Sequence, residues 1–224
     1  APRSAPRTAW GWAWAGALAG VLPAVVGFAP AHWLAGGVAR ATQGQVQLLQ
    51  PRGTVWTGSA QLVLTGGQAS KDSAALPGRV DWQLRPTWSG LRARLQAGCC
   101  TAEPLQAQVH LRWTGLQITL ADGQSQWPAA LLAGLGTPWN TLQPQGQLAL
   151  QTRALAVQWA EGRMVLSGQA QLDARAMSSR LSTLRPMGSY RLVLQGGEVP
   201  TLALSTLDGA LQLSGSGQWV GNRL

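Results

Sequence analysis

Strict alternation of apolar and polar residues recurs along most of this chain and constrains its fold more than any other feature. Leucine, valine or tryptophan stands at every second position of many short runs, with glutamine, arginine, threonine or serine between them. The alternating apolar positions are Leu62 and Leu64; Val80, Trp82 and Leu84; Leu91, Ala93 and Leu95; Leu105, Ala107, Val109, Leu111 and Trp113; Leu116, Ile118 and Leu120; Leu148 and Leu150; Leu155, Val157 and Trp159; Met164 and Leu166; Ala170 and Leu172; Leu192 and Leu194; Leu202 and Leu204; Leu211 and Leu213. A period of two residues predicts antiparallel strands that are buried on one face. We therefore expect a mainly β fold, built as a curved or two-layered antiparallel sheet.

The breaks between these runs predict turns and two short helices. Asp122-Gly123, Glu161-Gly162 and Asp208-Gly209 are candidate tight turns, since glycine adopts the positive φ that hairpins require. Residues 128–135 begin with a proline and end at a glycine-rich break, and residues 178–184 begin with serine and end before Pro186. Both segments are expected to be helical and to cover the sheet. Residues 217–224 read like the first half of a hairpin, so a continuation of the chain beyond them is one interpretation.

The beginning of the chain has a different character. No Lys, Arg, Asp or Glu lies between Arg7 and Arg40, which leaves room for the roughly 20 apolar residues of a membrane-spanning helix. We expect residues 9–30 to form that helix, with Pro23 as a kink or an early end. Arg3 and Arg7 precede it, so the N-terminus is expected in the cytoplasm and the bulk of the chain outside. The residues expected to anchor the chain are Trp10, Trp12, Trp14, Leu18, Val21, Leu22, Val25, Val26 and Phe28.

Two other interpretations of this segment remain. It could be a cleaved signal peptide, although three tryptophans are unusual there and Ala29-Pro-Ala-His32 is a poor cleavage site. It could also be a core helix of a soluble protein, although little of the remaining chain looks helical enough to bury it. The anchored interpretation divides the chain into a cytoplasmic tail (1–8), the membrane helix (9–30), an interfacial helix and linker (31–44, helical over 31–40) and an exported β domain (45–224).

The net charge of the chain limits the kinds of partner that it is expected to bind. Lys and Arg number 17 against 8 Asp and Glu, which gives a net charge of +9, and Lys71 is the single lysine. The arginines are scattered and form no basic stripe, which argues against nucleic acid. Acidic lipid head groups or an acidic partner suit an exported protein better. A genome that prefers arginine codons would produce the same bias without any function.

The sequence offers no recognisable set of catalytic, cofactor-binding or metal-binding residues. His32 and His110 lie in no local motif with a nucleophile, and the acids Asp72, Asp81, Glu103, Asp122, Glu161, Asp173, Glu198 and Asp208 are dispersed. The adjacent Cys99 and Cys100 could form a disulfide in an oxidising compartment, or each could reach another chain. Two adjacent cysteines without nearby histidines make a poor zinc site. We expect a non-enzymatic protein without cofactors, in which the cysteine pair staples a loop.

Three similar triplets suggest a repeated hairpin plan. Trp56-Thr-Gly58, Trp88-Ser-Gly90 and Trp113-Thr-Gly115 each place an indole before a small hydroxyl residue and a glycine. We interpret each as the end of a strand, where the large apolar tryptophan side chain is followed by a turn. Packing of these indoles in the core is favoured over stacking against a ligand.

Several segments together resemble one known family. The segment formed by Gly53, Thr54, Val55, Trp56, Thr57 and Gly58 resembles the central motif of type II secretion system protein N. The resemblance continues through the segments at 80–86, 127–132, 145–150, 181–190 and 209–217, in that order, and covers most of the chain including the anchor. It implies a bitopic inner-membrane protein of a Gram-negative bacterium with a periplasmic domain. Such a protein is an accessory part of the machine that moves folded proteins through the outer membrane, and no catalytic residues are implied.

Two functions of different classes follow. An assembly protein would bind other secretion components, in the inner membrane or the periplasm, through exposed sheet edges or through its anchor. A lipid-handling protein would carry acyl chains on an open sheet with an apolar groove. An apolar core closed by a second layer favours the first function, and an exposed apolar trough favours the second. The family resemblance favours assembly.

Overall fold

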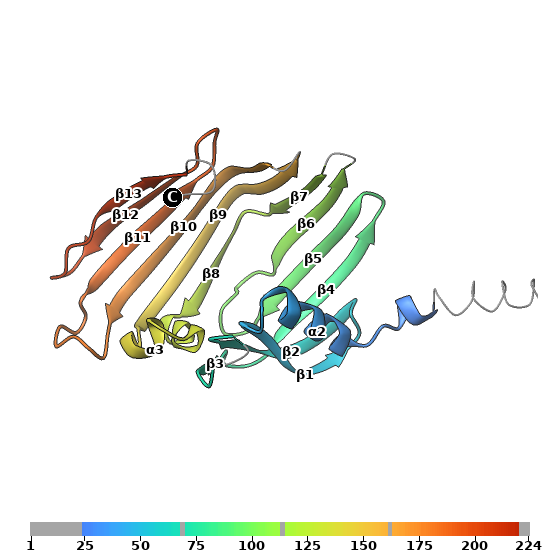
Figure 1. Ribbon diagram of the computed structural model, residues 1–224, viewed down its shortest axis with the longest axis horizontal. Coiled ribbons are helices and arrows are strands. Elements are labelled where there is room, and N and C mark those ends of the chain that lie inside the picture. The colour runs from blue at the N-terminus through green and yellow to red at the C-terminus, as the bar shows by residue number, and fades with distance from the viewer. Residues whose placement is uncertain (1–23, 68–69, 113–114, 161–162, 220–224) are drawn as a thin grey trace, which may run out of the picture.

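The described part of the protein is one antiparallel β-sheet with a few short helices at one end. The computed structural model describes residues 24–67, 70–112, 115–160 and 163–219. In these ranges 13 strands form a single sheet in the order β1-β2-β4-β5-β6-β7-β9-β10-β11-β12-β13, while β3 pairs with β2 and β8 with β9 (Figure 1). Most neighbours in the sheet are also neighbours along the chain, as expected for strands joined by hairpins. The mainly antiparallel β fold predicted from the alternation is confirmed.

The strands differ widely in length. Their bounds are β1 Val46–Gly53, β2 Thr57–Thr65, β3 Ser73–Ala75, β4 Val80–Thr87, β5 Gly90–Ala97, β6 Leu105–Arg112, β7 Gly115–Leu120, β8 Gly123–Pro128, β9 Gln145–Ala160, β10 Arg163–Ser178, β11 Gly188–Gln195, β12 Thr201–Asp208 and β13 Gly215–Gln218. The strands β9 and β10 pair along most of their length, and β7 and β8 both pair with β9. The centre of the sheet is therefore formed by one long hairpin.

The register gathers the alternating residues on one face. Leu150, Leu172, Leu192 and Leu204 stand side by side across β9, β10, β11 and β12. A second row crosses the other half of the sheet and consists of Leu91, Val109, Ile118, Val157 and Leu166. We call the face that carries these two rows the apolar face and the opposite one the polar face.

A β-bulge keeps the two rows on the same face of the long hairpin. Ala154 and Leu155 of β9 both stand opposite Gly168 of β10, and Ala154 has a φ of +46°. A side chain at Gly168 would collide with the carbonyl oxygen of Ala154, and its φ of +82° also suits glycine. The extra residue restores the alternation after the bulge. Leu155 consequently shares a face with Leu150, although the two are an odd number of residues apart.

Short helices cover only one end of the apolar face. The helix α2 (Ala31–Ala41) packs on β1 and β2, where Ala31, Ala60 and Trp82 form a small core. The 3-10 helix η1 (Ala129–Leu135) packs on β2, β3 and β9, and α3 (Trp139–Leu142) packs on η1. The second core lies beneath η1 and contains Leu76, Ala97, Cys100 and Leu131. Both buried clusters thus lie under these helices, and Leu166 and Tyr190 are buried outside them.

Several expectations from the sequence need correction. Of the two expected architectures, the two-layered one is wrong for the described ranges, which form a single open sheet that no second sheet covers. No helix forms at 178–184, because β10 runs to Ser178 and the Ser179 hydroxyl donates to the Leu142 carbonyl oxygen at 2.7 Å. Asp122-Gly123 does not reverse the chain, since β7 and β8 run on along β9 and Asp122 Oδ1 accepts a hydrogen bond from the Ala154 N–H at 2.6 Å.

The last predicted strand is also displaced. Leu211 and Leu213 lie outside any strand, and β13 begins only at Gly215. The backbone of Leu213 pairs with a side chain and not with a neighbouring strand. The Thr206 Oγ1 donates to the Leu213 carbonyl oxygen and accepts from the Leu213 N–H. The helix expected at 128–135 is present as the 3-10 helix η1, and a helix is present at 31–41. The Glu161-Gly162 turn lies outside the described residues.

The predicted membrane helix falls largely on residues that the structure does not describe. Among the described residues, no helix has the length and apolar character needed to cross a membrane. The anchor candidates Trp10, Trp12, Trp14, Leu18, Val21 and Leu22 lie outside the described ranges. Val25, Val26 and Phe28 lie inside them, and all three side chains are exposed.

Candidate interaction surfaces

The 53–58 segment joins the start of the described chain to the sheet. It links β1 to β2, and its Val55 N–H donates to the Ala29 carbonyl oxygen at 2.8 Å. The Trp56 indole Nε1 donates to the Val26 carbonyl oxygen at 2.7 Å, and Pro30 forms an isolated bridge with Thr54. This loop therefore holds the segment that leads into α2. We call it the joint.

Trp82 and two glycines fix the shape of the joint. The Trp82 side chain is only 3% exposed, and its Nε1 donates to the carbonyl oxygens of Thr54 and Val55 at 3.2 and 3.0 Å. A Cβ at Gly58 would lie 2.6 Å from the Trp82 ring and 2.5 Å from the Arg52 carbonyl oxygen. Gly53 has a φ of +87°, which disfavours any larger residue. The glycines of the motif are thus explained by close packing and backbone geometry.

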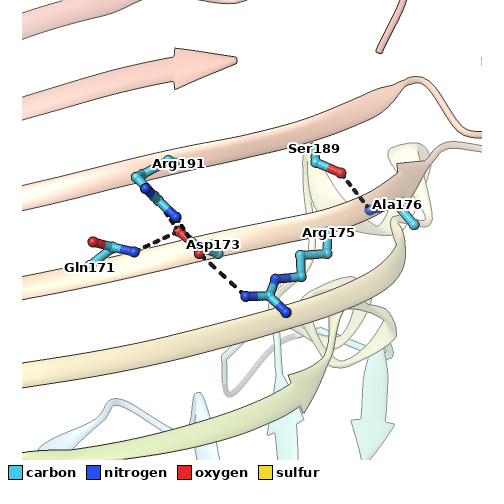
Figure 2. Close-up of polar contacts among 6 residues, drawn as sticks. All are labelled: Gln171, Asp173, Arg175, Ala176, Ser189 and Arg191. Atoms are coloured by element: carbon cyan, nitrogen blue, oxygen red, sulfur yellow. Dashed lines mark hydrogen bonds and ion pairs between the residues drawn. The ribbon is translucent and has the colours of Figure 1, made fainter. Parts of the chain in front are cut away.

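A buried carboxylate lies on the polar face of β10. The Asp173 residue is 1% exposed, and both of its oxygens accept hydrogen bonds from Arg191 on β11, each at 2.8 Å (Figure 2). Gln171 donates to Oδ1 at 3.1 Å, and the Arg175 guanidinium lies 3.6 Å from Oδ2. The hydrogen bonds from Arg191 lower the pKa of Asp173 against the opposing effect of burial, and Gln171 and Arg175 add to the lowering. Asp173 therefore clamps β10 to β11 as a carboxylate.

A polar groove of about 650 Å³ lies beside the joint. Arg52, Ser59, Asp81, Gln83 and Arg94 line it with alternate residues of β1, β2, β4 and β5. His110, the histidine that lies in the sheet, is bonded to the Ser89 hydroxyl through Nδ1 at 3.1 Å. Within the described ranges no three His, Cys, Asp or Glu side chains are grouped so that they could hold a metal ion. The polar face offers charge for binding, and its described residues form no recognisable catalytic set.

Much of the apolar face is uncovered. The described helices pack on β1, β2, β3 and β9, whereas the leucine rows continue across β5–β7 and β10–β12. Leu172, Leu192, Leu194 and Leu204 are only partly buried, although they lie in the interior of their strands. This face therefore offers a continuous row of partly exposed leucines to another molecule.

The other residues singled out from the sequence have different surroundings. Trp56 belongs to the joint, Trp113 lies outside the described residues, and Trp88 is fully exposed at 108%. The prediction that these indoles pack in the core is therefore wrong for Trp88, because the β4–β5 turn places it beyond the sheet. A disulfide of 2.13 Å joins Cys99 to Cys100 in the turn between β5 and β6, and Cys100 is buried beneath η1.

Sequence reasoning missed the Asp173 cluster. The sequence shows Gln171, Asp173 and Arg175 at alternate positions, which predicts that they share the polar face. Nothing in the sequence pairs Asp173 with Arg191, because that pairing depends on the register between β10 and β11. Only the register reveals that this acid is buried and paired.

The described structure is an open antiparallel sheet with an uncovered apolar face, and the joint holds its N-terminal segment against the sheet. This arrangement suits the binding of other molecules. The family model of type II secretion system (T2SS), protein N, matches residues 44–224. The chain belongs to this family, and the resemblance drawn from its sequence is confirmed over residues 44–224, while its extension to the N-terminal anchor stays a prediction. Comparisons with curated proteins and with solved structures gave no match. Family membership makes the protein an accessory component of type II secretion, associated with the cell envelope and with other components of that system.

Proposed function

We propose that the N-terminal apolar segment holds the protein in the inner membrane with the sheet in the periplasm. There the sheet binds another component of the secretion machinery through its uncovered apolar face. The observation that carries this proposal is the apolar row formed by Leu150, Leu172, Leu192 and Leu204, of which the last three lie on strands that no described helix packs against.

Physical arguments support a bound state for this face. Full burial of one leucine side chain stabilises a protein by about 1.5–3 kcal/mol. A partner that buried this row of partly exposed leucines would therefore gain part of that free energy for each leucine. Apolar patches larger than a few hundred Å² are rare on monomeric soluble proteins and mark interaction sites. A partner that covers this row would supply the second layer that an ordinary sheet domain contains within one chain.

The joint supports the membrane part of the proposal. Its contacts to Val26 and Ala29 fix the point at which the apolar N-terminal segment meets the sheet. A sheet held in this way would keep a defined orientation at the membrane surface. A flexible linker would leave that orientation free.

The test combines deletion with site-specific cross-linking. We expect deletion of the gene to abolish export of secreted enzymes while the outer membrane stays impermeable to a large antibiotic. A photo-reactive amino acid at Leu192 should cross-link to a secretion component, and one at Val193 on the polar face of the same strand should not. Normal export in the deletion strain, or equal cross-linking from both positions, would overturn the proposal.

A lipid-handling role is the second candidate, and the same uncovered face favours it. The rows contain Leu, Val and Ile, which suits contact with acyl chains as well as with an apolar protein surface. In that case the deletion strain should have a leaky outer membrane with normal export. The photo-reactive group at Leu192 should then cross-link to phospholipid.

A further inference from the structure

The ends of several neighbouring strands carry exposed apolar side chains. Trp88 forms the tip of the β4–β5 hairpin, with its whole side chain in solvent. Leu111, Leu116, Trp159 and Met164 stand in register across β6, β7, β9 and β10, and three of them are exposed: Leu111 by 70%, Trp159 by 41% and Met164 by 55%. We call these five residues the strand-end rim. Four of its members continue the apolar face to the ends of the strands, and Trp88 lies in the adjacent turn.

Arginines lie on the polar face just behind the rim. Arg85 and Arg92 stand directly opposite each other on β4 and β5, and Arg112 ends β6. All three are exposed, and among the described residues they form no ion pair. Like charges directly opposite each other destabilise a sheet unless an anion lies near them. The Arg85–Arg92 pair is therefore a place where a bound anion would stabilise the sheet.

The acids of β4 to β7 lie away from the β4–β5 and β6–β7 tips, whereas the sequence places Glu161 in the β9–β10 turn between Trp159 and Met164. Within residues 80–112 and 115–120 the acids are Asp81, at the start of β4, and Glu103, between β5 and β6. Both positions are remote along the chain from the β4–β5 and β6–β7 tips. The β4–β5 and β6–β7 tips thus combine exposed apolar side chains with arginines that form no ion pair among the described residues.

This combination matches the chemistry of a membrane surface. Indole rings favour the boundary between water and lipid, and arginines near it attract anionic phospholipid head groups. In Figure 1 the β4–β5 tip lies on the same right-hand side of the sheet as the start of the described chain. We propose that the strand-end rim docks on the anionic phospholipid surface of the membrane that holds the N-terminal segment. Trp88 and Leu111 enter the head-group layer, and Arg85 and Arg92 contact lipid phosphates.

This inference rests on the proposed anchoring, and the test separates the two. The full chain is reconstituted in vesicles with a genetically encoded dansyl amino acid at position 88, or at exposed position 212 in the turn beyond β12. With phosphatidylglycerol present, we expect a blue-shifted emission at position 88 that is quenched by a head-group spin label, and no change at position 212. Vesicles of phosphatidylcholine alone should give at most a third of the shift.

Charge variants provide the matched control. R85Q/R92Q should reduce the shift at position 88 at least twofold, and R180Q/R185Q, two exposed arginines between β10 and β11, should leave it unchanged. Water-like emission at position 88 in anionic vesicles would overturn the proposal, and so would a shift indifferent to lipid charge or one that required an added protein. Resistance of the chain to alkaline carbonate reports the anchor separately. If carbonate strips the chain, the anchoring fails while the emission at position 88 still decides whether the rim binds lipid.

Discussion

At the scale of single residues, Asp173 shows how an open sheet without a thick core holds two strands together. Its carboxylate lies between Gln171 and Arg191, and the hydrogen bonds from Arg191 lower its pKa. A lowered pKa in the folded state adds stability above the ordinary carboxyl range, and that stability is lost as the pH falls through the folded pKa. We expect D173N to lower the free energy of unfolding by about 1–3 kcal/mol at pH 7. The difference from the wild type should shrink in acid.

Urea unfolding of the full chain in detergent at pH 7 and pH 3 measures both effects. D208N is the matched control, because Asp208 is exposed at the end of β12 and forms no ion pair among the described residues. A loss of the same size at both pH values would contradict the role of the ionised carboxylate.

The two indoles of the β4 region differ in their burial and should therefore differ in their contribution to stability. Trp82 is buried under α2 and holds the joint, whereas Trp88 lies wholly in solvent. Truncation of a buried aromatic residue costs about 3–5 kcal/mol, and most surface changes stay within about 0.5 kcal/mol. We therefore expect W82A to be strongly destabilising and W88A to be nearly neutral in the same unfolding assay. A large stability loss in W88A would mean that its indole packs against the protein.

At the scale of elements, the sequence was informative wherever packing follows a simple period. The strands β4 to β7 and β9 to β12 were predicted because each places apolar residues at alternate positions. The edge strands β1 and β13 and the short β3 and β8 were missed, since they place few apolar residues at alternate positions. The helix expected at 178–184 fails because Ser179 binds the Leu142 carbonyl oxygen, a contact across 37 residues.

The candidate surfaces were predictable to a different degree. The motif at 53–58 could be read directly, but its contacts to Val26 and Trp82 could not, because they join three separate segments. An open apolar sheet face was one of two architectures left open by the alternation. Period alone states which residues share a face and says nothing about what covers it.

The contact between η1 and the sheet gives a prediction about an element. Gly134 lies so close to β2 and β3 that an added Cβ would meet the Leu64 carbonyl oxygen and lie 2.6 Å from the Ala74 nitrogen. G134A should push η1 away from the core that contains Leu76 and Leu131, at a cost of about 1–3 kcal/mol. G98A should be close to neutral, because nothing lies within 4 Å of the added Cβ. Thermal unfolding of both variants tests this, and equal midpoints would show that η1 tolerates the displacement.

At the scale of the whole molecule, the open sheet leaves two faces of opposite character. The apolar face is covered by helices at one end, and the polar face carries arginines, glutamines and the Asp173 cluster. Sheets normally bury an apolar face against a second layer. The described structure has no such layer over β10–β12, and the proposed function assigns this place to another molecule of the envelope.

Substitution on this face should therefore impair function more than folding. We expect L192Q, which places an amide in the row between Leu172 and Leu204, to reduce export of secreted enzymes at least fivefold. Since no described helix packs on Leu192, the free energy of unfolding should change by no more than about 1 kcal/mol. V193Q is the control, because it makes a similar change on the polar face of the same strand and should leave export normal. Export and unfolding are measured on the same strains and purified chains. If L192Q unfolds the protein, the leucine row belongs to a core within this chain, and a bound partner is no longer needed to explain it.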